Sequence, residues 1–289
     1  MNENMTALMS CFVRGYHAKN SNIKIYNDYY ANKILGEELY NNIYDNLSSG
    51  IEFFNKDCSI DPVLWIVNNQ LGPTVIGRSS FNEWHLLNEI NLGLRQYVVF
   101  ASGYDTSSYM VNDKVKVFEI DAYNMINDKI CRVKSANINN DNVCYIGCDL
   151  NDYDNNVLIS NGFNVNDKSF CSLLGISYYL DKDIFFNLIK NVSNILTSGS
   201  CILFDYPNDR DCDKESVNEV LASGASCSMK SHYSYDDIVS LCEECNLLIY
   251  EHLDNTDIDR DYFYDYNTIN DVKIKAFPGV SFCLLTKRG

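Results

Sequence analysis

The chain has 289 residues and a mass of 33.1 kDa, and 46% of its residues are hydrophobic, so it can bury a sizeable core and is expected to be globular. Its formal net charge is -16, and it has no block of Lys and Arg that could neutralise a phosphate backbone, which argues against binding nucleic acid or an anionic membrane surface. The first residues lack the apolar stretch of a signal peptide, and no apolar run has membrane-spanning length. We therefore expect a cytoplasmic protein.

The twelve cysteines and four histidines do not form a recognisable metal site. In a long chain without a signal peptide, scattered cysteines are expected to be reduced and mostly buried. Cys242 and Cys245 form one CxxC motif, and Cys144 and Cys148 flank a strand, but neither pair has a second pair at zinc-ribbon spacing. The histidines show no HxH or HExxH spacing. No metal is predicted.

The first third of the chain has the apolar spacing of helices. Asp61 and Pro62 are a good N-cap and first-turn pair for one of them. The helices are expected over residues 2–19, 31–47, 61–69 and 81–92. They would form a helical N-terminal cap region over residues 1–95, ahead of a core unit over residues 96–289.

From residue 96 onward, short apolar runs typical of buried strands alternate with helical patterns. Strands are predicted over residues 97–101, 115–120, 143–148, 169–174, 200–206, 247–251 and 279–285. Helices are predicted to begin near residue 105 and to cover residues 122–133, 183–196 and 235–245. A loop or short helix is expected over residues 208–230, and an acidic, tyrosine-rich loop before the last strand. Such alternation implies an α/β fold with a mostly parallel sheet, helices on both faces, and ligands beyond the carboxyl ends of the strands.

The segment from the first to the second of these strands carries the strongest functional signal. The first strand ends at Ser102 and Gly103, where a glycine lets a ligand approach the backbone. Asp105 begins a run of N-cap residues, so a helix is expected to start there and to direct its unpaired N–H groups at the same spot. The second strand ends at Asp121, where a βαβ unit places a carboxylate that accepts hydrogen bonds from ribose hydroxyls.

The turn differs from a dinucleotide-binding loop in two ways. Ala101 stands where a first glycine is usual, and Asp105 is an acid near the place of the pyrophosphate, which it would repel. A cofactor with a ribose but no phosphate fits better, and S-adenosylmethionine (SAM) is the commonest such cofactor. From these residues alone, an ordinary strand–turn–helix connection without a ligand is the alternative.

With these landmarks in place, the chain resembles the leucine carboxyl methyltransferase family of SAM-dependent O-methyltransferases, which includes bacterial polyketide carboxyl methyltransferases. The family's VVxLGAGxDT is VVFASGYDT here, and its FExD is FEID. The first motif places five residues at the cofactor loop, namely Ala101, Ser102, Gly103, Asp105 and Thr106. The second makes Asp121 resemble the ribose-binding acid, with Glu119 beside it, and the family's following lysine matches Lys129. The order and spacing of such motifs over most of the chain carry the resemblance.

The resemblance implies further cofactor contacts. An arginine in a helix-start context before the first strand matches Arg78, and in the family it contacts the methionine carboxylate of SAM. The family's acid–leucine pair after the third strand matches Asp149 and Leu150, which would lie near the adenine. The family's EGLLMYL is LGISYYL here, so its glutamate is Leu174 and its first loop glycine is Ala101. Both departures lie at the cofactor.

The fold that the resemblance implies is a Rossmann-like class I methyltransferase with about seven strands, the last of them antiparallel. A family Asp-Tyr pair at a strand end matches Asp205 and Tyr206. Tyr178, Tyr179 and Tyr206 stand at predicted strand ends and are candidates to line the pocket for the methyl acceptor. Ordinary core packing is the alternative for all three tyrosines.

Methyl transfer from a sulfonium to a carboxylate oxygen is an in-line displacement. A carboxylate is already ionised at neutral pH, so no general base is required, and catalysis consists mostly of positioning and desolvation. The sequence accordingly shows no GxSxG motif and no catalytic Cys/His signature. No catalytic residue is assigned. The expected partner is a small-molecule carboxylate.

Three other functions stay open at this point. The first is a family member that no longer methylates and acts as a binding or regulatory protein, which the departures at Ala101 and Leu174 favour. The second is a nicotinamide-dependent oxidoreductase, which the single-glycine turn and Asp105 disfavour. The third, methylation of a modified tRNA base, conflicts with the net charge of -16.

Overall fold

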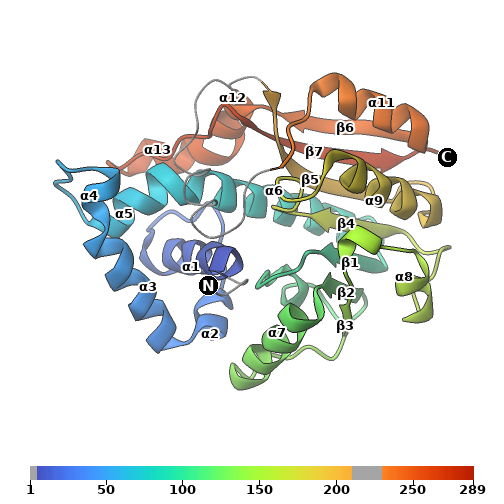
Figure 1. Cartoon of the computed structure of the whole chain (residues 1–289), viewed down its shortest axis with the longest axis horizontal. Coiled ribbons are helices and arrows are strands. Elements are labelled where there is room, and N and C mark those ends of the chain that lie inside the picture. The colour runs from blue at the N-terminus through green and yellow to red at the C-terminus, as the bar shows by residue number, and fades with distance from the viewer. Residues whose placement is uncertain (1–4, 210–229) are drawn as a thin grey trace.

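A seven-stranded sheet organises the molecule (Figure 1). The computed structural model describes residues 5–209 and 230–289. The strand order is β3-β2-β1-β4-β5-β7-β6. The strands are β1 Gln96–Phe100, β2 Lys116–Asp121, β3 Val143–Gly147, β4 Ser169–Leu173, β5 Cys201–Pro207, β6 Leu247–Leu253 and β7 Val280–Lys287. All predicted strands are present, with ends shifted by at most two residues.

The five strands from β3 to β5 are parallel, and β7 is inserted antiparallel between β5 and β6. The predicted α/β, Rossmann-like fold with an antiparallel last strand is confirmed. On β1, Val98 pairs with Phe118 of β2 and with Cys171 of β4. The carboxyl ends of β1, β2 and β4 therefore meet at one edge of the sheet, which is where such folds bind ligands.

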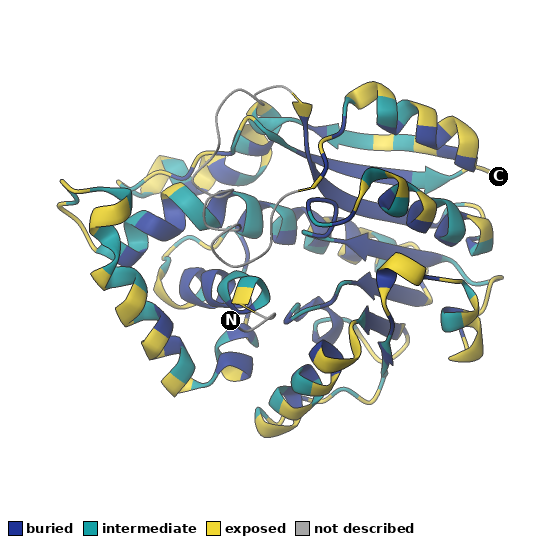
Figure 2. Ribbon diagram, viewed as in Figure 1, coloured by how far each residue is buried: buried dark blue, intermediate teal, exposed yellow. Residues whose placement is uncertain are grey.

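Helices cover both faces of the sheet. Those of the first part of the chain are α1 Met5–Asn20, α2 Ala31–Leu35, α3 Glu37–Ser49, α4 Ile51–Phe54, α5 Pro62–Ile66 and α6 Gly72–Asn91. Those interleaved with the strands are α7 Tyr123–Ser135, α8 Asn156–Ser160, α9 Lys182–Ile195, α11 Tyr235–Cys245, α12 Asn255–Ile258 and α13 Tyr264–Ile269. Figure 2 shows the inner strands β1, β4 and β5 buried, the edge strand β6 partly exposed, and the outer helices buried along one side only.

Alternate residues of the strands point into two separate hydrophobic clusters. Val99 of β1, Val117 of β2 and Leu203 of β5 join a cluster with residues of α1, α6 and α7, and we call this side the first face. Val98 and Phe118 join a cluster with residues of α8, α9 and α11, which is the second face. The described part of the predicted cap region, residues 5–95, thus shares one continuous core with the sheet.

The α-helix expected to begin near Asp105 does not form. Only a short 3-10 helix, η2 Ser107–Tyr109, lies between β1 and β2. The Asp105 carboxylate accepts hydrogen bonds from the backbone N–H and hydroxyl of Ser107, a local turn that competes with helix formation. In addition, α1 packs against this segment, because a Cβ placed on Gly103 would lie 3.3 Å from Cβ of Ala7.

Two other helical segments differ from the expectation. α6 begins at Gly72 and not near residue 81, and a π-helical turn, η1 Val67–Leu71, joins it to α5. Pro73 is tolerated there because the first turn of a helix leaves its N–H groups unpaired in any case. The acidic, tyrosine-rich segment before β7 is helical over α12 and α13, and the side chain of Asp254 caps α12 by accepting from the N–H groups of Thr256 and Asp257.

Several expectations concern what the chain lacks. Among residues 5–209 and 230–289, no helix combines the length and apolar character needed to cross a bilayer. Within the same ranges, no group of three or more His, Cys, Asp or Glu side chains is arranged to hold a metal ion. Cys242 and Cys245 are free thiols. The predicted loop or short helix over residues 208–230 lies almost entirely outside the described residues.

Candidate functional site

The turn after β1 and the carboxylate that ends β2 are in direct contact. The backbone N–H of Gly103 donates a hydrogen bond of 2.7 Å to Oδ2 of Asp121. Ala101 and Gly103 both adopt a positive φ, of 50° and 42°, which costs energy for the alanine and little for the glycine. The N–H of Ser102 donates to the carbonyl of Ile120, 3.1 Å away, and closes the turn against β2. The two strongest sequence signals thus form one local structure.

The Asp121 carboxylate lies near the surface of this turn and retains capacity for a ligand. Its second oxygen accepts the N–H of Ala122 at 2.7 Å. Burial raises the pKa of Asp121, although the hydrogen bonds from Gly103 and Ala122 and the charge of Lys129 act in the opposite direction. Each carboxylate oxygen has two lone pairs, so both can still accept hydroxyl groups.

The N-terminal helix α1 supports the turn from the first face. Nη2 of Arg14 donates a 2.6 Å hydrogen bond to the carbonyl of Tyr104, and its Nε lies 2.8 Å from Oδ2 of Asp28. Both side chains of this ion pair are nearly inaccessible to solvent. Sequence reasoning missed Arg14, because nothing in the local pattern of α1 indicates which distant backbone atom it would contact.

A buried hydroxyl joins the turn to the neighbouring elements. The phenol of Tyr97 on β1 lies 2.8 Å from Oγ of Ser107 and 3.0 Å from Oγ of Ser172 on β4, and it accepts from Nδ2 of Asn82 on α6 at 3.0 Å. Ser107 in turn binds Asp105. The position of the β1–β2 connection is therefore fixed by α6 and β4 as well as by its own turn.

A second polar cluster lies at the carboxyl ends of β4 and β5. Nη1 of Arg78, on α6, contacts Oδ2 of Asp205 at 3.0 Å, and the hydroxyl of Tyr178 donates to the same oxygen at 3.0 Å. The N–H of Gly175 donates to Oδ1 at 2.6 Å. The Arg78 guanidinium lies directly on Gly175, where a Cβ would come within 2.5 Å of Nη1.

Asp205 engages one nitrogen of the Arg78 guanidinium. The Asp205 side chain is completely buried, whereas 15% of the Arg78 side chain is exposed. The charge of Asp205 raises the pKa of Arg78 despite burial of the group. Nη1 is engaged by Asp205, so the remaining N–H groups of Arg78 are the ones that could reach a carboxylate. Asp205 was noted in the sequence only as part of an Asp-Tyr pair, with no role.

The end of β3 lies next to Asp121. The N–H of Cys148 donates to the carbonyl of Asp121 at 2.8 Å, so the following Asp149 and Leu150 continue from the same edge. Asp149 is exposed and binds the N–H and side-chain amide of Asn151, and these hydrogen bonds lower its pKa. Leu150 is buried in the cluster of the second face. Leu174 follows β4 and packs, half-buried, against the first face.

Two of the expected site residues point elsewhere. Glu119 lies deeper in the sheet than Asp121, and its fully buried carboxylate is 2.6 Å from Nζ of Lys129, which is also buried. That pair supports the turn from below, because Lys129 Nζ lies 3.4 Å from the carbonyl of Ser102. Tyr206 points into the second face, where its hydroxyl is 2.7 Å from Nε2 of His252.

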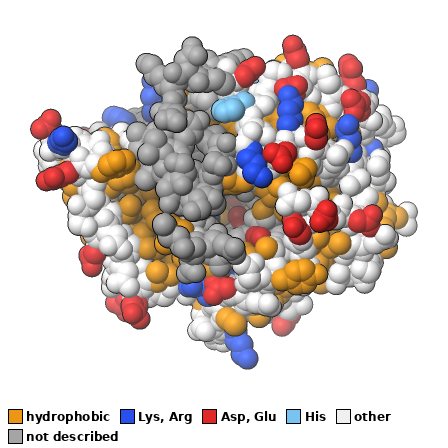
Figure 3. All heavy atoms as spheres, viewed as in Figure 1, with side chains coloured by type: hydrophobic (Ala, Val, Ile, Leu, Met, Phe, Trp, Pro, Cys, Tyr) orange, Lys and Arg blue, Asp and Glu red, His pale blue; other side chains and the backbone are white. Residues whose placement is uncertain are grey.

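The remaining predicted pocket residues differ in accessibility. Tyr178 is buried and held by Asp205, whereas Tyr179 is half-buried, with its ring 6.2 Å from that of Tyr178. On β5, Asp205 and Tyr206 are consecutive and point to opposite faces of the sheet, so Tyr178 lies with Asp205 on the first face and Tyr206 lies on the second. Figure 3 shows the surface hollowed near the middle of the molecule, with acidic side chains at its depth.

The residues at this edge suit an adenosyl cofactor. Within the described part of the chain, the buried hydroxyl of Ser102 has no hydrogen-bond partner, although it lies in the turn itself. Buried polar groups are normally paired, so an unpaired hydroxyl at a ligand edge is a place for a ligand or water. Asp121 supplies acceptors for a ribose, and Arg78 supplies donors for a carboxylate.

Comparison with known proteins identifies the family. Residues 7–193 match the leucine carboxyl methyltransferase family. The chain belongs to that family. The resemblance inferred from the sequence is therefore confirmed. The chain is also 32% identical over 302 aligned residues to YktD of Bacillus subtilis, with 98% of each protein covered, and the name of that protein assigns it provisionally to the SAM-dependent methyltransferases.

Solved structures show the same fold. A DUF574 family protein from Streptomyces avermitilis superposes with a TM-score of 0.62 at 12% identity, covering 98% of this chain and 97% of that one. Magnesium protoporphyrin IX methyltransferase from Synechocystis, with S-adenosylhomocysteine bound, gives a TM-score of 0.50 at 10% identity over 86% and 98% of the two chains. S-adenosylmethionine, the cofactor predicted from the turn, is the cofactor of this family of methyltransferases.

Proposed function

We propose that this member of the leucine carboxyl methyltransferase family transfers a methyl group from SAM to a carboxylate oxygen of a small molecule. The observation that carries the proposal is the contact of 2.7 Å between Gly103 and Asp121 at the carboxyl ends of adjacent parallel strands. That contact supports the proposal because it sets a glycine turn beside a carboxylate that has lone pairs to accept ribose hydroxyls. When bound, the cofactor supplies an electrophilic methyl group on a sulfonium.

Each residue at the edge then has a distinct task. Asp121 accepts the ribose hydroxyls, and Asp149 and Leu150 lie along the edge beside it for the adenine. Arg78 pairs with the methionine carboxylate through the N–H groups that Asp205 does not use. Asp205 is a positioning residue, since its oxygens hold Arg78, Tyr178 and the N–H of Gly175 together.

The acceptor needs no proton removed. Its carboxylate is ionised at neutral pH, so the protein contributes orientation and exclusion of water rather than a general base. Tyr179 is the half-buried tyrosine of the predicted pocket and is the best placed of the three to contact an acceptor. Tyr178 would act indirectly, through Asp205.

The two departures from the family pattern are compatible with cofactor binding. Ala101 adopts the positive φ that the family's glycine would take more easily, so the turn keeps its shape at some conformational cost. Leu174 cannot make the polar contact of the family's glutamate. The fully buried Asp205, one strand away, keeps a carboxylate in this part of the structure. These features favour an active enzyme over a member that has lost the cofactor.

The test combines binding with product chemistry. Calorimetry should show binding of SAM and S-adenosylhomocysteine, and incubation with methyl-labelled SAM and a panel of small carboxylic acids should yield a methyl ester. Mild base releases methanol from an ester but not from a methyl ether or methylamine, so the label released identifies the acceptor atom. Arg78→Lys keeps the charge but loses the guanidinium fork, and it should weaken SAM binding. Glu38→Gln, an exposed acid on α3, serves as the control.

The outcomes separate the candidate functions. If SAM binds but the methylated product is stable to base, the protein is a methyltransferase whose acceptor is not a carboxylate. Failure of SAM to bind at millimolar concentration would favour a regulatory or binding protein. If the Arg78→Lys variant binds SAM as tightly as the parent protein, the guanidinium of Arg78 makes no bidentate contact with the cofactor.

A further inference from the structure

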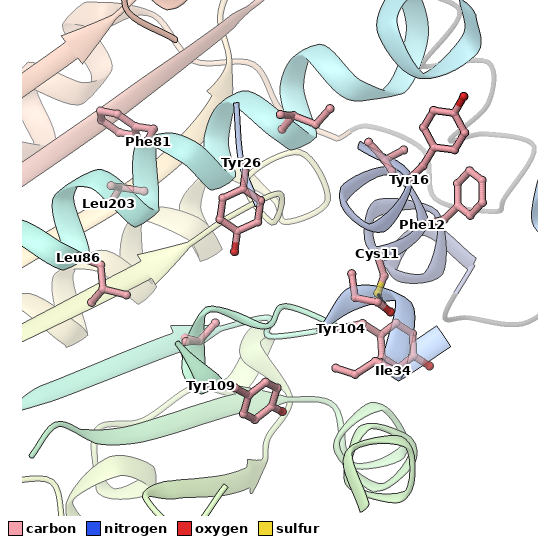
Figure 4. Close-up of a cluster of buried hydrophobic side chains, with 14 of the residues drawn as sticks. Cys11, Phe12, Tyr16, Tyr26, Ile34, Phe81, Leu86, Tyr104, Tyr109 and Leu203 are labelled. Atoms are coloured by element: carbon pink, nitrogen blue, oxygen red, sulfur yellow. Dashed lines mark hydrogen bonds between the residues drawn. The ribbon is translucent and has the colours of Figure 1, made fainter. Parts of the chain in front are cut away.

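A pocket lies on the first face, and neither Gly103 nor Asp121 lines it. Its volume is about 330 Å³. It is bounded by the second half of α6, by the loop between α1 and α2, and by the connection between β1 and β2. Figure 4 labels Tyr26, Leu86 and Tyr109, one from each segment, among the buried side chains of the first face.

The pocket follows from the missing crossover helix. Parallel strands are usually joined by an α-helix that packs on the sheet, but here the β1–β2 connection contains only η2. Tyr26 and Tyr109 fill part of the space and are 3% and 9% exposed. The hydroxyl of Tyr26 lies 3.7 Å from Sδ of Met110, and the rings of Tyr30 and Tyr109 meet edge to face at 5.9 Å. The remaining space is left open among these side chains.

The lining has a definite chemical character. Four tyrosines, Tyr26, Tyr29, Tyr30 and Tyr109, contribute to it, and Glu83 is the one charged residue. Glu83 is half-buried and makes no ion pair within the described residues. Burial raises the pKa of its carboxyl, and the charge of Asp28 adds to that effect. A carboxylate in this position lacks the cation that would compensate for its burial.

We propose that this pocket binds a small organic cation, with its ammonium nitrogen beside Glu83 and its carbon body against the tyrosines. Aromatic faces attract cations through their quadrupole, and a carboxylate at partly reduced dielectric adds a Coulomb attraction. An anion is disfavoured by Glu83 and by the net charge of -16. The proposal rests on this pocket alone and does not depend on the identity of the methyl acceptor.

An occupant would contact the segment that follows the turn at residues 101–103, which we call the cofactor turn. Ser107 lines the pocket, its N–H donates to Oδ1 of Asp105 at 2.8 Å, and its hydroxyl lies 2.8 Å from that of Tyr97. The pocket and the cofactor turn are thus neighbouring sites that share one short connection.

The experiment compares three probes of nearly equal shape: benzylammonium, benzyl alcohol and benzoate. Binding to the full chain is measured by calorimetry and saturation-transfer NMR at physiological ionic strength. Benzylammonium should bind about tenfold more tightly than benzyl alcohol, and benzoate should bind least. The Glu83→Gln substitution should lower the affinity for benzylammonium to that for benzyl alcohol. Glu38→Gln removes a charge from the exposed surface of α3 and should change nothing.

A second variant locates the site. Val111→Phe adds bulk to the lining and should weaken binding of benzylammonium and benzyl alcohol alike, with circular dichroism confirming the fold. Equal binding of all three probes, absence of benzylammonium binding at millimolar concentration, or an unchanged affinity in Glu83→Gln would overturn the proposal. The Glu83 test stands even if Val111→Phe does not fold. An equal loss in Glu38→Gln would indicate general attraction to the acidic chain and would also reject the site.

Discussion

The two faces of the sheet are filled differently. Among residues 5–209 and 230–289, the most deeply buried ion pairs lie on the first face, and they are Arg14–Asp28, Arg78–Asp205 and Glu119–Lys129. On the second face the core is apolar, and its ion pairs, such as Lys182–Asp237 and Lys190–Glu244, lie in exposed positions. These three buried pairs thus lie on the side that supports the turn after β1.

The two faces differ less in how much they stabilise the fold than in which substitutions they tolerate. A buried ion pair gains little net free energy over an apolar pair of similar size, but removing one partner leaves a desolvated charge. The first face therefore accepts few single substitutions at these positions. The second face depends on apolar packing, which tolerates substitutions that keep volume.

The largest effect should come from breaking the Glu119–Lys129 pair. Lys129→Met leaves the Glu119 carboxylate buried without its partner, so the free energy of unfolding should fall by about 3 to 5 kcal/mol, measured by urea denaturation. On the second face, Lys190→Met should cause no measurable change, because that pair is exposed to solvent. A similar loss in both variants would show that the two faces do not differ in this way.

A matched double variant sharpens this test. Replacing both Glu119 and Lys129 with Met removes the charges together, and it should restore most of the stability lost by Lys129→Met alone. If the double variant is no more stable than the single one, the loss comes from packing and not from an unpaired charge.

The next largest effect should be a dependence of the free energy of unfolding on pH, caused by His17 on the first face. Its Nε2 accepts the N–H of Ile25 at 3.0 Å, which requires a neutral ring. Burial lowers the pKa of His17 from 6.5 to about 4. Between these values the unfolded chain binds a proton that the folded chain does not, so stability should fall as the pH decreases from 6.5 to about 4, by about 3 kcal/mol in total.

His17→Gln is the variant that checks this dependence. It removes the titrating group, so the slope of stability against pH in that window should become shallower than in the parent protein. Equal slopes in the two proteins would mean that His17 titrates alike in the folded and unfolded chains.

Asp121→Ala should have a smaller effect, on ligand binding. Loss of a hydrogen bond to a charged group weakens binding by about 1 to 3 kcal/mol, which calorimetry with SAM would detect. Asp121→Asn keeps an acceptor for Gly103 and for one ribose hydroxyl, and it should lie between the parent and the alanine variant. If both variants bind SAM with unchanged affinity, Asp121 does not contact the cofactor.

The smallest effect should come from a helix cap on the second face. Oγ of Ser234 accepts the N–H of Asp237 at 3.1 Å, and Asp237 accepts the N–H of Ser234 in return. Ser234→Ala should lower the free energy of unfolding by about 1 kcal/mol and leave SAM affinity unchanged. A change in SAM affinity would link the second face to the site.

Most of the sheet and the centre of the candidate site could be predicted from the sequence. Strand runs such as residues 97–101 are apolar, short and bounded by turn residues, so their hydrophobic pattern alone marks them. Gly103 and Asp121 are separated by one strand and its connection, and parallel pairing brings such strand ends together. The segments that were missed, such as α6 before residue 81 and the helices after residue 254, carry glycine, proline or acidic residues whose local preferences are overridden by packing and capping.

The sequence by itself determined where the strands lie along the chain, the position of the glycine turn and the acid that closes β2, because each of these is marked by a local pattern of residues. Only the tertiary structure decided that α1 packs against the turn after β1, that Glu119 pairs with Lys129, and that Asp205 holds Arg78. Those contacts join residues far apart in the chain. Their partners are selected by the shape of the core and by the cost of leaving a charge unpaired inside it.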